Sequence, residues 1–365
     1  MKVPIINLTM QYEKYREEID NAIRRVFSHS HFVFGEELEN FEKELSRYVG
    51  VKFALGVANG TDALLLSLYA LGVGEGDEVI TTPFTFFATA EVIAMLHAKP
   101  VFVDIEDNSM NINPELITDA ITSHTKVIIP VHLFGRCAAM NRIMDIAKKN
   151  NLFVVEDAAQ AIGARFNDKM AGSFGDAAGM SFFPTKNLGA AGDAGAILTN
   201  GVELYEKIKK LRMHGADKKY FHRFIGFNNR MDAIQAAVLS VKIKYIDEWN
   251  KRRREIADKY TLSLKPYVWT PINTEGYFSV YHQYTIRTHN RNELKDYLKE
   301  RGVSTAIHYP IPLHLQPAFA YLGYKKGDLP VAERVADEVL SLPIYPEMTD
   351  RMVDFVIESV LQFFK

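Results

Sequence analysis

The stretch Leu152-Phe153-Val154-Val155-Glu156-Asp157 is a short apolar run that ends in two acids. Similar runs recur over the first two thirds of the chain, and stretches with helical spacing separate them. Short strands that are apolar throughout are typical of a parallel sheet buried on both faces. The pattern therefore predicts an α/β fold with a mostly parallel central sheet and helices on both faces.

The order of the expected elements follows from this alternation. After helices at 11–28 and 36–48, strands are expected at 51–57, 78–81, 100–104, 126–131, 152–156, 177–182 and 194–198, with helices at 62–70, 85–96, 114–121 and 140–149 between them. Farther on, the sequence predicts a long charged helix at 239–262, a strand at 281–288, and helices at 291–302 and 334–341. We therefore expect two domains, a large one at 1–245 and a smaller C-terminal α+β domain at 246–365.

Composition argues against several kinds of partner and site. The 365 residues include 43 Lys and Arg against 45 Asp and Glu, so no basic surplus points to nucleic acid or an anionic membrane surface. The single Cys137 excludes an intramolecular disulfide, and the 11 histidines show no metal-ligand spacing, so no metal is expected. The first ten residues are too short and mixed for a signal peptide, and no apolar run approaches the roughly 20 residues of a membrane span. We therefore expect a cytoplasmic protein.

Asp157 and Lys186 each follow the carboxyl end of an expected strand. Open α/β sheets bind ligands at this edge, so both side chains would face one site. An amine that forms a Schiff base, together with an acid that keeps a pyridinium nitrogen protonated, is what pyridoxal 5'-phosphate (PLP) requires of an enzyme. The apolar residues before Lys186 argue for its burial, which would lower its pKa and make it a nucleophile and base. Taken singly, Lys186 could be an exposed loop lysine and Asp157 a helix cap.

Other strand ends carry residues that suit a bound cofactor. Gly60 and Thr61 lie at a helix start, where free amides and the helix dipole could hold a phosphate, although an ordinary capped helix would explain them as well. One ring of Phe84-Thr85-Phe86-Phe87 could stack on a planar cofactor, with core packing as the alternative. Gln160 lies close enough to Asp157 in the sequence to reach a phenolic oxygen of the same ring.

Two later segments place polar side chains beside turns. Asn228 and Arg230 lie just before an expected helix, where a capped turn is the plainer explanation. His308 and Tyr309 lie in Ile307-His308-Tyr309-Pro310-Ile311-Pro312, which its prolines make stiff. Polar groups on a stiff loop suit sugar hydroxyls, and a purely structural turn is the alternative.

In their order along the chain, these segments resemble the nucleotide-sugar aminotransferases of the DegT/DnrJ/StrS family, which are fold-type I PLP enzymes. The matching segments are 59–64, 156–160, 181–189, 226–230 with 235–237, and 308–310. The likeness runs over nearly the whole chain, from about Ile5 to Pro346. It implies the fold-type I aminotransferase architecture, with PLP as the cofactor and pyridoxamine phosphate as its aminated form.

The resemblance also implies a role for each position. Lys186 would be the catalytic Schiff-base lysine, and Asp157 would pair with the pyridinium nitrogen. Family members are homodimers with shared active sites, so some residues would serve the partner subunit. The further cofactor contacts would be Gln160 on the ring oxygen, Phe86 on the ring face, Gly60, Thr61 and Ser181 on the phosphate, and Asn228 on the partner's phosphate. The residues for the sugar nucleotide would be Arg230, His308 and Tyr309.

The implied reaction is a transamination in two halves. L-Glutamate would give its amino group to PLP and leave as 2-oxoglutarate, and the amine would then pass to C3 of a 3-keto nucleotide sugar. Segments 212–222 and 279–285 are similar to enzymes for UDP-2-acetamido-2-deoxy-3-keto-glucose or -glucuronic acid, which serve bacterial surface polysaccharide such as lipopolysaccharide O-antigen. Segments 226–228 and 242–245 leave a dTDP-3-keto-6-deoxyhexose open.

Three other functions are alternatives to a sugar aminotransferase. A non-catalytic regulator could use the same fold, but the presence of both Lys186 and Asp157 argues against it. A nicotinamide oxidoreductase should show Gly-x-Gly-x-x-Gly after an early strand, and the sequence has none there. One type of family member carries histidine in place of the lysine and performs a 3-dehydration, so Lys186 favours transamination.

Overall fold

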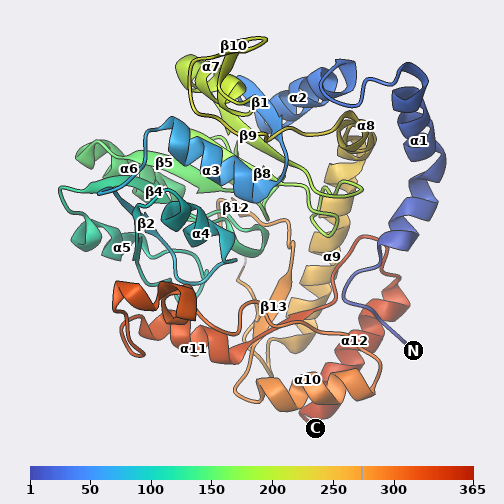
Figure 1. Cartoon of the computed structure of the whole chain (residues 1–365). Coiled ribbons are helices and arrows are strands. Elements are labelled where there is room, and N and C mark those ends of the chain that lie inside the picture. The colour runs from blue at the N-terminus through green and yellow to red at the C-terminus, as the bar shows by residue number, and fades with distance from the viewer. Residues whose placement is uncertain (273) are drawn as a thin grey trace.

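A computed structural model describes residues 1–272 and 274–365, and a seven-stranded sheet forms the centre of its larger part (Figure 1). Only β9 runs antiparallel to its neighbours in this sheet, so the prediction of a mostly parallel sheet is confirmed. From edge to edge, the strands are β1 (Phe53–Val57), β9 (Gly195–Thr199), β8 (Ala177–Ser181), β5 (Phe153–Asp157), β4 (Thr125–Ile129), β2 (Glu78–Thr81) and β3 (Lys99–Phe102).

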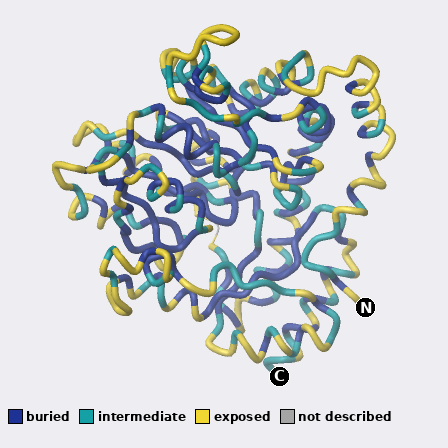
Figure 2. The backbone as a smooth tube through the Cα atoms, in the orientation of Figure 1, coloured by how far each residue is buried: buried dark blue, intermediate teal, exposed yellow. Residues whose placement is uncertain are grey.

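Helices cover both faces of the sheet, as its apolar strands require. Successive strand residues point to opposite faces, and accordingly Val154 and Val155 of β5 belong to different apolar clusters. Figure 2 shows the strands as largely buried and the outer helix surfaces as exposed. The helices on the Val155 face are α3 (Gly60–Ala70), α4 (Ala88–Met95) and α7 (Val202–Leu211). Those on the Val154 face are α1 (Leu8–His29), α2 (Glu36–Val49), α5 (Pro114–Ile117), α6 (Met140–Asn150) and α8 (Ala233–Lys242).

The C-terminal part has its own apolar cluster beneath the sheet in the view of Figure 1. A 3-10 turn, Ile243–Tyr245, separates α8 from the first helix of this part and coincides with the predicted domain boundary. Val3 from the N-terminus also packs into the C-terminal cluster, so the division at residue 245 stays a prediction. The elements of this part are α9 (Ile246–Leu264), β12 (Tyr277–Phe278), β13 (Tyr284–Arg287), α10 (Arg291–Glu300), α11 (Pro330–Glu338), β14 (Val339–Leu342) and α12 (Asp350–Phe363).

Two helix predictions in the C-terminal region are wrong in part. The expected helix at 334–341 ends at Glu338, and Val339–Leu342 instead forms β14, which pairs antiparallel with β13. Pairing with a strand more than fifty positions away here outweighs local helical spacing. The expected helix at 239–262 is two helices, α8 and α9, joined by the 3-10 turn.

Several strands and two helices were not anticipated from the sequence. Two of them, β10 and β11, form a hairpin at the top of Figure 1, and Figure 2 shows its tip exposed. Within the described residues, no helix is long and apolar enough to cross a membrane. The unanticipated strands are β6 (Arg165–Phe166), β7 (Lys169–Met170), β10 (Ala216–Lys218), β11 (Phe221–His222) and β12, and the unanticipated helices are α7 and α12.

Candidate active site

Lys186 lies in a tight turn that follows β8. Its backbone N–H donates to the carbonyl oxygen of Phe183 at 2.8 Å, and a Cβ added at Gly189 would lie 2.2 Å from the carbonyl oxygen of Pro184, so only glycine fits there. Burial lowers the pKa of Lys186 to about 8, while the charge of Asp157 acts in the opposite direction. An amine with this pKa is neutral in a useful fraction of molecules near pH 7 and can act as a nucleophile.

Asp157 ends β5 and points to the face that α3 and α4 cover. Its backbone N–H donates to the carbonyl oxygen of Pro130 at 2.9 Å, which fixes the strand end. Its side chain is buried and accepts hydrogen bonds from the hydroxyl of Thr89 at 2.7 Å and from the backbone N–H of Ala159 at 3.2 Å. A carboxylate has about four acceptor positions, so two protein donors leave room for a ring N–H.

Gln160 is held in one orientation by its two ends. Its Oε1 accepts from the backbone N–H of Phe134 at 2.7 Å, and its Nε2 donates to the hydroxyl of Tyr309 at 3.0 Å. One N–H of Nε2 remains for a ring oxygen. Burial raises the pKa of Tyr309, which therefore remains a neutral phenol at physiological pH.

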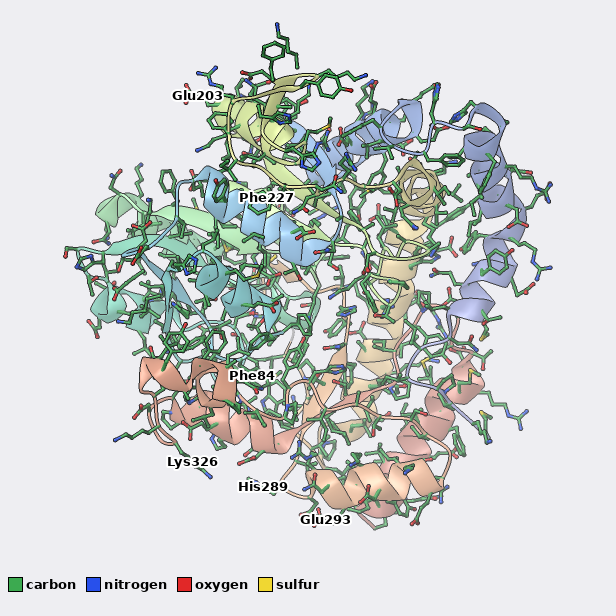
Figure 3. All side chains as sticks on the ribbon, in the orientation of Figure 1. Phe84, Glu203, Phe227, His289, Glu293 and Lys326 are labelled. Atoms are coloured by element: carbon green, nitrogen blue, oxygen red, sulfur yellow. The ribbon has the colours of Figure 1, made fainter. Side chains whose placement is uncertain are left out.

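His308 and Phe86 lie next to the same group of residues. The Nδ1 atom of His308 is 2.9 Å from the hydroxyl of Ser341, and burial together with the charge of Lys186 lowers its pKa to about 4. The ring of Phe86 is 59% exposed and its centroid is 6.3 Å from that of Tyr309. Phe84, labelled in Figure 3, is fully buried and contacts Tyr309 edge-on, so the core-packing interpretation holds for Phe84.

The start of α3 and the end of β8 form a cradle of backbone. The side chain of Asn59 caps α3 by accepting from the backbone N–H of Asp62 at 2.8 Å, which leaves the first amides of the helix available. A Cβ added at Gly60 would lie 2.7 Å from the Cβ of Ser181, so the two residues adjoin and Gly60 must be glycine. The structure thus brings Gly60, Thr61 and Ser181 together at a helix N-terminus, which suits a phosphate. Together with the partly buried Lys186, this geometry fits PLP.

Asn228 and Arg230 are not joined to this group by any contact found in the described part of the chain. Asn228 is exposed and its backbone bridges to Met213, beside the β10–β11 hairpin. Arg230 is half-buried. An exposed Asn228 fits the prediction that it serves a partner subunit, which stays a prediction.

Sequence reasoning missed three polar residues of this region: Thr89, Asn187 and His282. The Nδ1 atom of His282 is 3.2 Å from Oδ1 of Asn187, the residue after Lys186. Burial, together with the charges of Lys186, Arg253 and His308, lowers the pKa of His282 well below its usual value. The spacing of Thr89, four positions after Thr85, is a weak sign that the two side chains meet on one helix face. No other site residue lies near His282 in the sequence, so its place could not be inferred.

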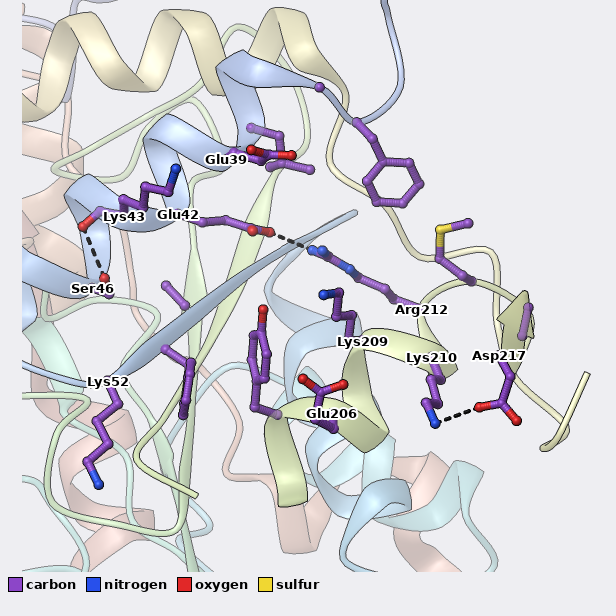
Figure 4. Close-up of a pocket in the computed structure, with 18 of the residues that line it drawn as sticks. Glu39, Glu42, Lys43, Ser46, Lys52, Glu206, Lys209, Lys210, Arg212 and Asp217 are labelled. Carbon is purple, nitrogen blue, oxygen red and sulfur yellow. Dashed lines mark hydrogen bonds and ion pairs between the residues drawn. The ribbon is translucent and has the colours of Figure 1, made fainter. Parts of the chain in front are cut away.

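A cavity of about 860 Å³ lies elsewhere, at the edge of the sheet beside β1 (Figure 4). It is walled by α2, α7 and the β10 strand, and an ion pair of 2.6 Å joins Arg212 to Glu42 inside it. None of the predicted site residues lines this cavity. Volume alone does not define an active site, and the titratable groups with suitable chemistry gather around Lys186 instead.

Three curated relatives are similar to this chain over nearly its whole length. The chain is 49% identical to the "Pleiotropic regulatory protein" of Geobacillus stearothermophilus, across 100% of this chain and 99% of the relative. It is 44% identical to the UDP-2-acetamido-2-deoxy-3-oxo-D-glucuronate aminotransferase of Pseudomonas aeruginosa, across 98% and 99% of the two chains. It is also 44% identical to the dTDP-3-amino-3,6-dideoxy-alpha-D-galactopyranose transaminase of Aneurinibacillus thermoaerophilus, across 99% of each.

Solved structures agree with the fold and the cofactor. DesV of S. venezuelae, in complex with a ketimine intermediate, superposes with a TM-score of 0.97 at 40% identity, over 99% of this chain and 98% of that one. NtdA of Bacillus subtilis, with bound cofactor PMP, gives a TM-score of 0.92 at 35% identity, over 99% and 85%. The fold-type I architecture and the PLP cofactor are therefore confirmed.

The model of the DegT/DnrJ/EryC1/StrS aminotransferase family matches residues 13–361, which is nearly the whole chain. Relatives across this range are named as nucleotide-sugar transaminases, and the resemblance drawn from the sequence segments is thereby confirmed. The chain belongs to the DegT/DnrJ/EryC1/StrS family of PLP-dependent aminotransferases, and its activity is that of a nucleotide-sugar aminotransferase.

Proposed function

We propose that this protein transfers the amino group of L-glutamate to C3 of UDP-2-acetamido-2-deoxy-3-keto-glucuronic acid or of the corresponding keto-glucose. The observation that carries the proposal is Lys186, a partly buried amine whose pKa is lowered by desolvation to about 8 and which lies within electrostatic reach of Asp157. A sugar aminotransferase needs one group that both holds the cofactor and moves protons, and a lysine of this pKa can do both.

The polar residues of the site divide the tasks of this reaction among them. When bound, PLP supplies an electron sink for the carbon atom that loses its proton. The Nζ atom of Lys186 would take that proton and return it to the carbon on the other side of the transferred nitrogen atom. Asp157 keeps the ring nitrogen protonated, and the free N–H of Gln160 binds the ring oxygen. Gly60, with the first amides of α3, binds the phosphate.

His308 and Tyr309 lie where the sugar would approach. His308 is neutral at pH 7, because burial and Lys186 lower its pKa to about 4, so it offers hydrogen bonds without charge. Tyr309 also donates or accepts as a neutral phenol, since burial raises its pKa. Neutral groups suit sugar hydroxyls, and Arg230 supplies a cation for the diphosphate of the nucleotide.

The nucleotide is the finer part of the proposal. Segments 212–222 and 279–285 support a UDP-linked acetamido sugar, as does the name of the Pseudomonas aeruginosa relative. A dTDP-3-keto-6-deoxyhexose is the alternative, since a relative with a dTDP-sugar name is equally similar at 44% identity. With the UDP substrate, we infer a role in bacterial surface polysaccharide such as lipopolysaccharide O-antigen, in the cytoplasm.

A panel of UDP- and dTDP-linked keto sugars tests the choice of substrate. Each is incubated with the PLP-loaded protein and L-glutamate, and the amino sugar is detected by mass. We expect the highest kcat/KM with a UDP-2-acetamido-3-keto sugar. Conversion of dTDP sugars alone would reject the UDP assignment and retain the aminotransferase.

A regulatory function is the second candidate, because the relative at 49% identity is named a pleiotropic regulatory protein. The exposed ring of Phe86 beside Tyr309 and the lowered pKa of Lys186 are what a catalytic site needs, which favours catalysis. The two functions separate in cells: a catalytic role requires Lys186, whereas a purely regulatory role would persist in a folded Lys186→Ala variant.

We also propose a homodimer with shared active sites. The β10–β11 hairpin carries Tyr220 and Phe221, which are 81% and 61% exposed, and Ile225, three residues after it, is 83% exposed. Apolar side chains exposed on one hairpin and on the segment that follows it indicate a contact surface. Asn228 follows the same hairpin. A partner subunit that covers these side chains would therefore bring Asn228 toward the phosphate cradle of the partner subunit.

A further inference from the structure

A chain of two buried hydroxyls ends on the carboxylate of Asp157. The hydroxyl of Thr89, in the first turn of α4, lies 2.7 Å from Oδ2 of Asp157. The hydroxyl of Thr85 lies 3.1 Å from that of Thr89. Thr89 is fully buried and Thr85 is 2% exposed, so bulk water does not compete for either contact.

The direction of the protons in this chain follows from the acceptor at its end. An ionised carboxylate only accepts, so the hydroxyl of Thr89 must donate its single proton to Asp157. Thr89 then has no proton left for Thr85, and Thr85 is the donor in their pair. The hydroxyls therefore run in one direction, from Thr85 through Thr89 to Asp157, and each polarises the next.

We propose that Thr89, supported by Thr85, is a positioning residue that orients Asp157 toward the ring nitrogen of PLP. The proposal rests on the proposed function of Asp157. The two oxygens of this carboxylate are already distinguished, since Oδ1 accepts from the backbone N–H of Ala159 and Oδ2 from Thr89. Two fixed donors on opposite oxygens stop rotation of the carboxylate about its last bond, which leaves a defined acceptor direction for the ring N–H.

The same chain couples two contacts of the cofactor ring. Thr85 immediately precedes Phe86, the residue proposed to stack on the ring, and Thr89 follows it by three positions. The hydrogen bonds thus tie the segment that carries the stacking ring to the carboxylate at the ring nitrogen. A displacement of either threonine would disturb the face and the edge of the ring together.

Cofactor binding to the apoprotein tests this role apart from turnover. In Thr89→Val, which removes the hydroxyl and keeps the shape, PLP affinity should fall about tenfold, the net value of a hydrogen bond to a charged group. The pH at which the visible band of the lysine-bound cofactor changes should also shift, because the ring nitrogen loses an oriented partner. Thr89→Ser should restore both quantities, and Thr85→Val should show a smaller loss in the same direction.

Thr199→Val is the matched control, since Thr199 is 2% exposed and donates to the carbonyl oxygen of Asp176 at 2.7 Å, at the far end of β9. It should change neither affinity nor the spectral pH transition. Wild-type affinity and an unchanged transition in Thr89→Val would overturn the proposal, and where Thr89→Val does not fold, the same result in Thr85→Val would do so. Asp157→Asn separates the role of Asp157 from the supporting role of Thr89. Wild-type cofactor affinity in that variant would reject the role of Asp157 itself.

Discussion

The Nε2 atom of Gln160 donates a hydrogen bond of 3.0 Å to the hydroxyl of Tyr309, although 149 positions separate the two residues. This bond joins the segment after β5, which carries the proposed cofactor ligands, to the stiff loop proposed for the sugar. Because Oε1 of Gln160 is held by the backbone N–H of Phe134, the amide cannot turn over without loss of both bonds. The position of the sugar loop is therefore linked to the ring-oxygen contact of the cofactor.

Removal of this bond should reduce catalysis without loss of the fold. In Tyr309→Phe, a buried N–H of Gln160 loses its partner, so we expect kcat/KM to fall about tenfold. Tyr260→Phe is the matched control, because the hydroxyl of Tyr260 donates to the carbonyl oxygen of Pro343 at 2.9 Å in the C-terminal cluster. The control should lose about 1 kcal/mol of unfolding free energy and keep kcat/KM. Equal kcat/KM for Tyr309→Phe and the wild type would refute the link.

Two lysines with lowered pKa values offer a direct test of which amine holds the cofactor. Burial lowers the pKa of both Lys186 and Lys242 to about 8. The Nζ of Lys242, however, donates to the carbonyl oxygen of Gly189 at 2.7 Å and supports the turn that carries Lys186. Borohydride reduction of the PLP-loaded protein, followed by peptide mapping, should therefore place the cofactor on Lys186. Label on the peptide of Lys242 instead would disprove the assignment.

Burial of Lys186 should cost the apoprotein stability in a pH-dependent way. Its folded pKa of about 8 lies below the ordinary value of 10.5, so the unfolded chain binds more protons between these values and stability rises with pH there. Below pH 8 the loss of unfolding free energy caused by Lys186 is at its full value. Lys186→Met should therefore raise the unfolding free energy of the apoprotein at pH 7 by up to about 3 kcal/mol. The gain, measured by urea unfolding, should shrink toward pH 10; a gain independent of pH would contradict the lowered pKa.

The residues around Lys186 show what a sequence can and cannot predict. Asp157 and Lys186 were recognisable because each follows the end of an apolar strand, and parallel strands bring their carboxyl ends to one edge. His282 was not recognisable, because its place beside Asn187 depends on how the C-terminal part packs on the sheet. The same limit explains β14, whose residues have helical spacing locally and form a strand only because β13 lies beside them.

Shared active sites predict complementation between inactive variants. Lys186→Ala and Asn228→Ala would each disable both sites of a homodimer, but a mixed dimer would contain one site with both residues intact. After subunit exchange, about a quarter of wild-type activity should return, since half of the randomly paired dimers are mixed and each has one complete site. Lys186→Ala mixed with Asp157→Asn should not recover, because both residues belong to one subunit's site. Equal recovery in both mixtures, or none in the first with exchange confirmed, would count against the shared site.

Transfer of isotope from glutamate to sugar tests the central claim most directly. The PLP-loaded protein is incubated with L-glutamate labelled with nitrogen-15 and a UDP-2-acetamido-3-keto sugar, and the product is analysed by mass and NMR. We predict that the labelled nitrogen appears on C3 of the sugar in the wild type and is absent from the product mixture of Lys186→Ala, which still folds. Failure of the wild-type protein to label any UDP- or dTDP-linked keto sugar, with PLP bound, would contradict the account.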